Sequence, residues 1–315
     1  MTFAIRTQAL SRSFGPVRAV DGLTMDVLAG TVFGFLGPNG SGKTTTIRLL
    51  LGLLDADGGR AEVLGFDTQS QADEVRLRCG ALLEHNGLYE RLTAEDNLVF
   101  YARVWRLPKN ERDERVKSLL TDMGLWERRG EQVGKWSRGM KQKLAIARTL
   151  LHRPKLVFLD EPTAGLDPIA AAALHEDLIN MAQREGVTIF LTTHNLAEAE
   201  KLCREVGVVR KGKLLAVGAL DRLRAQAGGP RVEITGRGFT PELLDKVRSL
   251  PDVTEASSEN GKLTIRLGQA IETGPIVNLL VTHGAEIEEV RKGKANLEET
   301  FLTLMNEETS EEAQA

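Results

Sequence analysis

Apolar residues along the first 220 positions form two kinds of pattern. Short runs at 31–36, 156–159 and 187–191 are apolar and partly β-branched or aromatic, which predicts buried parallel strands. Longer stretches at 138–151 and 170–184 are predicted to be helices, the first with apolar residues at three- and four-residue spacing. Because strand mostly precedes helix along the chain, the sequence predicts an α/β fold with crossover helices joining a parallel sheet.

Weaker signals place the other elements of this region. Strands are expected at 3–10, 17–28, 60–64, 80–83, 206–210 and 213–217, and helices at 45–51, 72–77, 111–123 and 195–203. Thr93 and Ser137 are suited to begin helices, because a hydroxyl oxygen can accept a hydrogen bond from a first-turn N–H. Helices dominate from 93 to 151, which predicts a separate helical lobe.

A second pattern begins after Gly228-Gly229-Pro230, which is typical of a linker. Strands at 231–236, 253–258, 262–267 and 285–290 and helices at 241–250 and 273–283 follow, and then a helix at 297–306. Their order is βαββαβ, which predicts a small ferredoxin-like α+β domain. The residues after Met305 are acidic and polar and predict a frayed tail. The expected domains are therefore 1–227 and 228–315.

Composition excludes some classes of protein and leaves others open. With 315 residues, 27% charged and 42% hydrophobic, the chain has the make-up of an ordinary globular protein of two domains or one large one. The net charge of −3 indicates no general attraction to nucleic acid or anionic lipid. From Ala225 onward the chain has 9 basic and 16 acidic residues, so its excess of negative charge lies in the second domain.

Two absences bear on the compartment. No apolar run approaches the ~18 residues of a membrane-spanning helix, and the first residues lack the apolar core of a signal peptide. Cys79 and Cys203 have no metal-binding or redox spacing and are expected to be packed thiols. The chain is therefore expected on the cytoplasmic side of the membrane.

The run from Gly37 to Thr44 matches the phosphate-loop pattern G-x-x-x-x-G-K-[ST] between a predicted strand and a predicted helix. Its glycines allow successive N–H groups to point at an anion, and the helix N-terminus adds partial positive charge. Lys43 is expected to reach the β- and γ-phosphates, and the Thr44 hydroxyl to hold Mg²⁺. The nucleotide-binding residues predicted here are Gly37, Pro38, Asn39, Gly40, Ser41, Gly42, Lys43, Thr44 and Thr45.

The strand at 156–159 ends in Asp160 and Glu161. A carboxylate after an apolar strand is costly unless it is exposed at the strand end or holds a metal. These two carboxylates are therefore expected to be exposed at the strand end or to hold a metal.

Together these segments resemble the ATP-binding cassette of ABC transporters over about residues 3–220, with several short motifs in the family's order. They are the phosphate loop, the signature-like Ser137-Arg-Gly-Met-Lys-Gln, the strand ending in Asp160-Glu161, the loop Ala164-Gly-Leu-Asp167, the switch-histidine position His194 and the adenine-stacking position Phe14. The resemblance implies a P-loop NTPase core of the RecA-like type, with antiparallel β and helical subdomains.

The resemblance also implies roles for single residues. Lys43 would neutralise phosphate charge, and Thr44 with Asp160 would anchor Mg²⁺. Glu161 would polarise the attacking water, and His194 would contact the γ-phosphate and hold Glu161 in line. In this family two cassettes face head to tail, so Ser137 and Gly139 of one copy would cap ATP held by the other.

Three positions depart from the family pattern. Glu84 stands where most cassettes have a glutamine that senses Mg²⁺, so a carboxylate would meet the metal or a water there. Arg138 replaces a common glycine; it is either a cation facing the partner's phosphates or a solvated surface arginine. Met140 replaces the usual glutamine of the signature.

The leading hypothesis is an ATPase subunit that energises export through separate transmembrane permease subunits. It would work as a homodimer at the cytoplasmic face of the membrane, docked through a groove around 84–101. The C-terminal part resembles the accessory domain found in one branch of the ABC transporter family. The segment Leu297-Glu-Glu-Thr-Phe-Leu302 is typical of that branch, which includes drug-resistance, sodium and copper-related exporters.

Two other hypotheses remain open. The first is a soluble cassette ATPase acting on ribosomes or DNA, which the single cassette, the absence of sustained heptads and the acidic second domain disfavour. No nucleic-acid partner is therefore expected. The second, compatible with the leading hypothesis, makes the second domain a ligand-sensing regulator or a dimer clamp.

Overall fold

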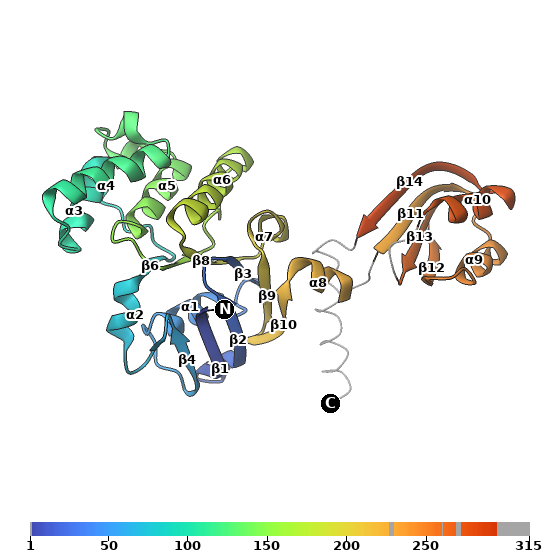
Figure 1. Ribbon diagram of the computed structural model, residues 1–315, viewed down its shortest axis with the longest axis horizontal. Coiled ribbons are helices and arrows are strands. Elements are labelled where there is room, and N and C mark those ends of the chain that lie inside the picture. The colour runs from blue at the N-terminus through green and yellow to red at the C-terminus, as the bar shows by residue number, and fades with distance from the viewer. Residues whose placement is uncertain (1, 227–229, 260, 269–271, 295–315) are drawn as a thin grey trace. The chain divides into compact units, whose positions relative to one another are not determined.

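The computed structural model describes residues 2–226, 230–259, 261–268 and 272–294 (Figure 1). Contacts within the chain divide it into two compact units, Met1–Val217 and Gly218–Ala315. The division falls ten residues before the boundary expected from the linker, because the short helix α8 (Leu220–Gln226) is grouped with the second unit.

The first unit is built on a six-stranded sheet with the strand order β10-β9-β3-β8-β7-β6. These strands are β3 (Val32–Leu36), β6 (Cys79–Leu82), β7 (Leu156–Asp160), β8 (Thr188–Thr193), β9 (Glu205–Arg210) and β10 (Lys213–Ala219). The pairs β6–β7, β7–β8, β8–β3 and β3–β9 are parallel, as the apolar runs predict. Phe33, Phe158 and Phe190 are fully buried, and the Phe190 ring lies 5.5 Å from each of the other two.

A second, antiparallel sheet has the order β2-β1-β4-β5. It consists of β1 (Phe3–Phe14), β2 (Val17–Leu28), β4 (Gly58–Val63) and β5 (Phe66–Asp67). Strand β1 continues four residues beyond its predicted end, through register irregularities near Ala9, whose φ is +48°. The helix α1 (Lys43–Leu50) contributes Ile47 and Leu50 to a core shared with both sheets.

The remaining helices of this unit are α2 (Ala72–Arg78), α3 (Ala94–Val104), α4 (Lys109–Asp122), α5 (Arg138–Thr149), α6 (Pro168–Glu185) and α7 (Leu196–Leu202), with 3₁₀ turns at Trp126–Arg128 and Val133–Lys135. Helices α3, α4 and α5 gather in one lobe, as predicted (Figure 1). Thr93 and Ser137 accept hydrogen bonds from Asp96 N and Met140 N, so both predicted helix caps are confirmed. No helix among the described residues is long and apolar enough to cross a bilayer.

The second unit contains β11 (Pro230–Arg237), α9 (Pro241–Arg248), β12 (Val253–Glu259), β13 (Lys262–Leu267), α10 (Gly274–Thr282) and β14 (Glu286–Lys294). Its antiparallel sheet has the order β12-β13-β11-β14, which is the ferredoxin-like arrangement predicted from the sequence. Val232, Ile234 and Ile265 of the sheet are buried in one core with Leu243 and Leu280 of the two helices. The helix predicted at 297–306 and the predicted tail lie outside the described residues.

Candidate functional site

The phosphate loop joins β3 to α1, and its backbone fits closely against neighbouring segments. Gly42 has φ +102°, and a Cβ built on it would lie only 2.1 Å from the carbonyl oxygen of Ala19. Gly37 N donates to Thr193 O at 3.2 Å, which joins the loop to the end of β8. Because α1 begins at Lys43, its first N–H groups face the loop, and the helix end favours an anion there.

Lys43 is 6% exposed and has its ammonium group held at the loop. Its Nζ donates to Gly37 O at 2.8 Å and to Pro38 O at 3.0 Å, and lies 3.2 Å from Glu161 Oε1. The predicted phosphate-binding cation and the predicted water-polarising carboxylate are therefore in direct contact.

Asp160 ends β7 with both carboxylate oxygens engaged. Thr44 Oγ1 donates to Oδ2 at 2.6 Å, and the Thr192 hydroxyl donates to Oδ1. A hydroxyl beside a carboxylate is an all-oxygen donor pair of the kind that Mg²⁺ prefers. In the described part of the chain no cluster of three or more His, Cys, Asp or Glu is arranged to hold a metal, so an ion here needs further oxygens from phosphate or water.

Glu161 follows β7 in the left-handed backbone region, with φ +47°. Its N–H donates to both the carbonyl and the hydroxyl oxygen of Thr192 at 3.1 Å, which fixes this backbone conformation. Glu161 Oε2 lies 3.1 Å from Nδ1 of His194, a residue that is about half exposed just after β8. The structure thus brings together Lys43, Glu161 and His194, which are the three residues predicted to be catalytic.

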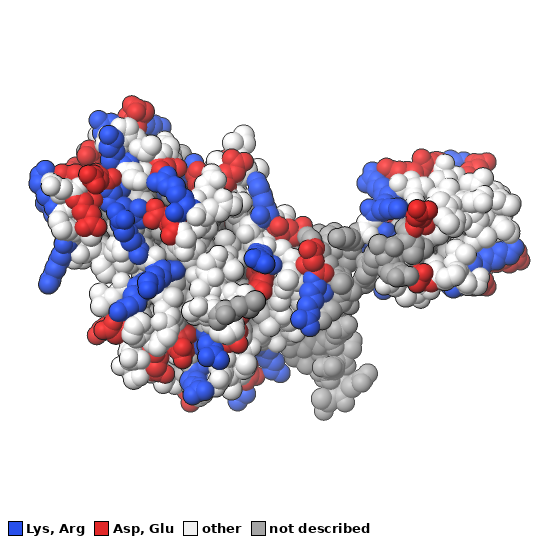
Figure 2. Space-filling view, viewed as in Figure 1, with Lys and Arg blue, Asp and Glu red and all other residues white. Residues whose placement is uncertain are grey.

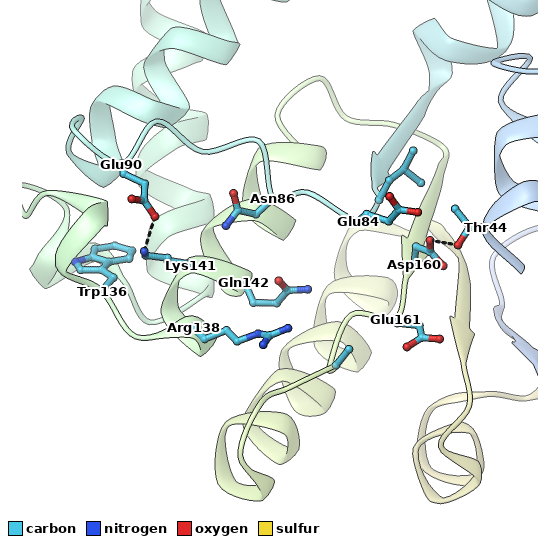
Figure 3. A pocket seen from close by; sticks show the side chains of 12 residues that line it. Thr44, Glu84, Asn86, Glu90, Trp136, Arg138, Lys141, Gln142, Asp160 and Glu161 are labelled. Atoms are coloured by element: carbon cyan, nitrogen blue, oxygen red, sulfur yellow. Dashed lines mark hydrogen bonds and ion pairs between the residues drawn. The ribbon is translucent and has the colours of Figure 1, made fainter. Parts of the chain in front are cut away.

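A cleft of about 550 Å³ opens beside Asp160 and Glu161 (Figure 3). Its walls come from α1, from the loop after β6, from the start of α5 and from the loop after β7. The lining residues are Thr44, Leu83, Glu84, Asn86, Glu90, Trp136, Arg138, Lys141, Gln142, Asp160, Glu161 and Ala164. Gln142 Nε2 donates to Pro162 O at 2.7 Å, which ties α5 to the loop that follows Glu161.

Glu84 lies in this cleft together with Thr44 and Asp160, as its predicted role requires. Its carboxylate is also paired with Arg48 of α1 at 3.3 Å, and its side chain is 58% exposed. The local negative charge of Glu84 is therefore partly balanced by a neighbour that the sequence analysis did not consider.

Arg138 lines the same cleft and lies against a loop of its own chain. A Cβ built on Gly165 would lie 2.3 Å from Arg138 Nη1, so the guanidinium occupies the space beside that glycine. Arg138 as a whole is exposed. Ser137 and Gly139 begin α5, and neither is among the residues that line the two clefts beside Glu161.

A second cleft, also about 550 Å³, lies on the other side of the phosphate loop. Sequence reasoning assigned Asn39, Gly40, Gly42, Lys43, Thr44, Thr45 and Glu161 to this region, and it missed Val17, Arg18, Ala19 and Lys211. The turn at 211–212, between β9 and β10, reaches the loop because Gly212 N donates to Ser41 O at 3.1 Å. Phe14 pairs in register with Val17 and is 46% exposed, and the Arg12 guanidinium lies 5.0 Å from its ring centre.

Comparisons with known proteins agree with this geometry. The family model for ABC transporters matches residues 20–164. The bacitracin transport ATP-binding protein BcrA of Bacillus licheniformis is 34% identical over 306 residues, which is 97% of this chain and 98% of that protein. The daunorubicin/doxorubicin resistance ATP-binding protein DrrA of Streptomyces peucetius is 34% identical over 309 residues, covering 96% of this chain and 92% of its own length.

A solved structure of the ATP-binding subunit of an ABC transporter is 33% identical, with a TM-score of 0.63 over 71% of this chain and 92% of that chain. These likenesses confirm the predicted P-loop fold and favour the transporter subunit over an ATPase of ribosomes or DNA. The chain belongs to the ABC transporter family, as an ATP-binding and ATP-hydrolysing subunit that serves transmembrane partners.

Proposed function

We propose that this chain drives export by hydrolysing Mg²⁺-ATP between two copies of itself, docked on separate membrane-spanning subunits. The observation that carries the proposal is the contact of Lys43 and His194 with the two oxygens of Glu161, at 3.2 and 3.1 Å. Export is supported by the relatives that match nearly the full length, whose names refer to bacitracin transport and to daunorubicin/doxorubicin resistance.

The binding roles follow from the contacts. Lys43 and the loop N–H groups would hold the β- and γ-phosphates, and Val17 and Lys211 would border the rest of the nucleotide. Phe14 would stack on the adenine. Thr44 and Asp160 would hold Mg²⁺, with Glu84 near enough to contact it through water. The ion would neutralise charge on the phosphate oxygens.

Hydrolysis would depend on Glu161. A carboxylate within hydrogen-bond reach of a water orients it and accepts its proton as the γ-phosphate is attacked. His194 would hold the Glu161 carboxylate on one side while touching the γ-phosphate. Lys43 would stabilise the charge that develops on the transferred group.

Dimerisation is supported by what the chain leaves exposed. Ser137 and Gly139 stand at the N-terminal end of α5, away from the phosphate loop of their own chain, where they could cap a partner's γ-phosphate. Ile169 is the second residue of α6, which follows the loop 164–167, and it is 84% exposed. An apolar side chain so open to water beside this loop suits a contact with a second copy.

Docking on a membrane subunit is supported by an aromatic patch near the cleft. Tyr89 is 47% exposed, Phe100 41% and Val104 63%, and the rings of Tyr89 and Phe100 lie 4.9 Å apart. Nucleic acid is not proposed as a partner, because Lys and Arg are intermixed with Asp and Glu on the face shown in Figure 2.

The test is a dimer assay by light scattering with Mg²⁺-ATP. Glu161→Gln should form a stable dimer because ATP is bound but not consumed. Adding Ser137→Arg should leave the chain monomeric with ATP still bound, since the partner's γ-phosphate could no longer be capped. A Glu161→Gln chain that binds ATP and stays monomeric, even with its membrane subunits, would refute the dimer proposal.

The domain assignment has its own test. We propose that 1–227 is the nucleotide-binding domain and 228–315 an accessory domain. A chain ending at residue 228 should then bind ATP as tightly as the full chain. A folded truncation that binds no ATP would show that the boundary is wrong.

A further inference from the structure

Glu198 is a buried carboxylate that no motif of the family pattern includes. It lies in the first turn of α7, and its side chain is 1% exposed. An acidic side chain is rarely buried to this extent unless partners satisfy it. Its partners come from three segments: the loop after β7, helix α6 and the end of β8.

Three side-chain groups converge on this carboxylate. Thr163 Oγ1 donates to Oε1 at 2.8 Å, His175 Nε2 lies 3.1 Å from the same oxygen, and the Thr193 hydroxyl donates to Oε2. Because an ionised carboxylate only accepts, His175 must carry its hydrogen on Nε2. All three partners are buried or partly buried, so water competes little for these bonds.

The positions of these partners connect the carboxylate to hydrolysis. Thr193 directly precedes His194, Thr163 follows Glu161 by two residues, and His175 lies on α6 after the loop 164–167. Thr193 Oγ1 also accepts from Asn195 N at 2.9 Å, so its hydroxyl is fixed as donor on one side and acceptor on the other. The Thr193 hydroxyl therefore links the residues before and after His194, and this fixes the backbone of His194 between them.

We propose that Glu198 is a positioning residue for ATP hydrolysis: it anchors the segment 193–195 to the loop after Glu161 and to α6, and so holds His194 against Glu161. This inference rests on the proposed role of His194. The hydrogen bonds of the Glu198 carboxylate go to Thr163, His175 and Thr193, so it acts on His194 through the Thr193 hydroxyl.

Both oxygens of Glu198 are needed as hydrogen-bond acceptors, and not only the shape of the side chain. In Glu198→Gln one oxygen could still accept from Thr163 and His175. An amide NH₂ facing Thr193 would donate, however, and it could not accept the hydrogen that the Thr193 hydroxyl now donates to Oε2. The Thr193 hydroxyl would lose its acceptor, and the segment that carries His194 would be free to shift.

The experiment measures single-turnover ATP hydrolysis, ATP affinity and melting temperature on the full chain. Glu198→Gln should slow hydrolysis about 10-fold or more, because small misplacements of catalytic groups have effects of this size. Its ATP Kd should stay unchanged. The matched control is Glu185→Gln, which removes a partly buried ion pair with Arg115 outside the site and should lower the melting temperature without slowing hydrolysis.

A milder pair of variants covers the case in which Glu198→Gln does not fold. Thr193→Val should slow hydrolysis, and Thr193→Ser, which keeps the hydroxyl, should restore it. Equal rates for the two would overturn the proposal.

A double mutant separates this inference from the proposed function. In a His194→Ala chain, Glu198→Gln should cause no further loss of rate, because the residue it positions is gone. A full additional loss there, or an unchanged rate in Glu198→Gln alone while His194→Ala is slow, would overturn the positioning role. A normal rate in His194→Ala would instead refute the assignment of His194.

Discussion

Replacing Glu161 by glutamine removes one charge at the centre of the site and leaves its size unchanged. Both carboxylate oxygens are engaged, Oε1 with Lys43 and Oε2 with His194. The amide keeps one acceptor but cannot take a proton from water. Lys43 retains its bonds to two loop carbonyls, so the phosphate-binding geometry should remain.

The expected magnitude follows from this difference. A positioned acid–base group contributes roughly 10²- to 10⁴-fold to a rate, which corresponds to about 3–5 kcal/mol of activation free energy. Because both contacts of Glu161 are lost or altered together, we expect the upper part of this range. ATP affinity should be unchanged or slightly higher, since a negative charge next to the phosphates is removed.

The assay is single-turnover hydrolysis with excess protein, alongside ATP binding at equilibrium. Glu90→Gln is the matched control, because it makes the same chemical change in the same cleft, where Glu90 pairs with Lys141 at 2.7 Å. It should hydrolyse ATP normally. A Glu161→Gln rate within threefold of the unmodified chain, or a loss of ATP binding, would refute the reasoning.

Three further changes have defined outcomes. Lys43→Ala should abolish ATP binding or turnover in an isothermal titration and a phosphate-release assay, and unaltered activity would contradict the phosphate-loop assignment. Gly42→Ala should lower the free energy of unfolding by about 2–3 kcal/mol in urea, because it combines backbone strain with a clash against a carbonyl, whereas Gly40→Ala, with open space around it, should cost only about 1 kcal/mol. Glu185→Gln should cost about 1–2 kcal/mol at pH 7, because it weakens a partly exposed pair with Arg115. The hydrogen bond from Arg115 lowers the pKa of Glu185 from its usual value, so this difference should shrink as the pH falls below about 4.5. A difference independent of pH would exclude the ion pair as its cause.

Local features of the sequence were sufficient to predict most elements. The apolar run at 156–159, the cap at Ser137 and the βαββαβ order of the second unit each depend on neighbouring residues, and the structure has all of them. Strand ends were less accurate, since β1 continues to Phe14 through bulges that depend on pairing with β2. A bulge is fixed by the partner strand, which a single run of residues does not reveal.

Contacts between distant segments were not predictable in the same way. Lys211 lies at a hairpin turn with no distinctive sequence, and the hydrogen bond from Gly212 N to Ser41 O brings that turn to the phosphate loop. In the sequence Glu198 has the appearance of an ordinary helix-surface residue. Its partners could not be predicted, because they come from segments up to 35 positions away. The sequence therefore indicated which residues carry the chemistry, but not the residues that hold them in place.

The left-handed backbone of Glu161 sets stability and activity in conflict at one position. An ordinary residue in that conformation costs the fold about 1 kcal/mol, a cost that glycine largely avoids. Glycine at position 161 would relieve this backbone cost, but it would also remove the carboxylate that pairs with the buried Lys43 ammonium. A laboratory evolution experiment that rewards heat resistance alone should therefore favour glycine there only after Lys43 has also been replaced.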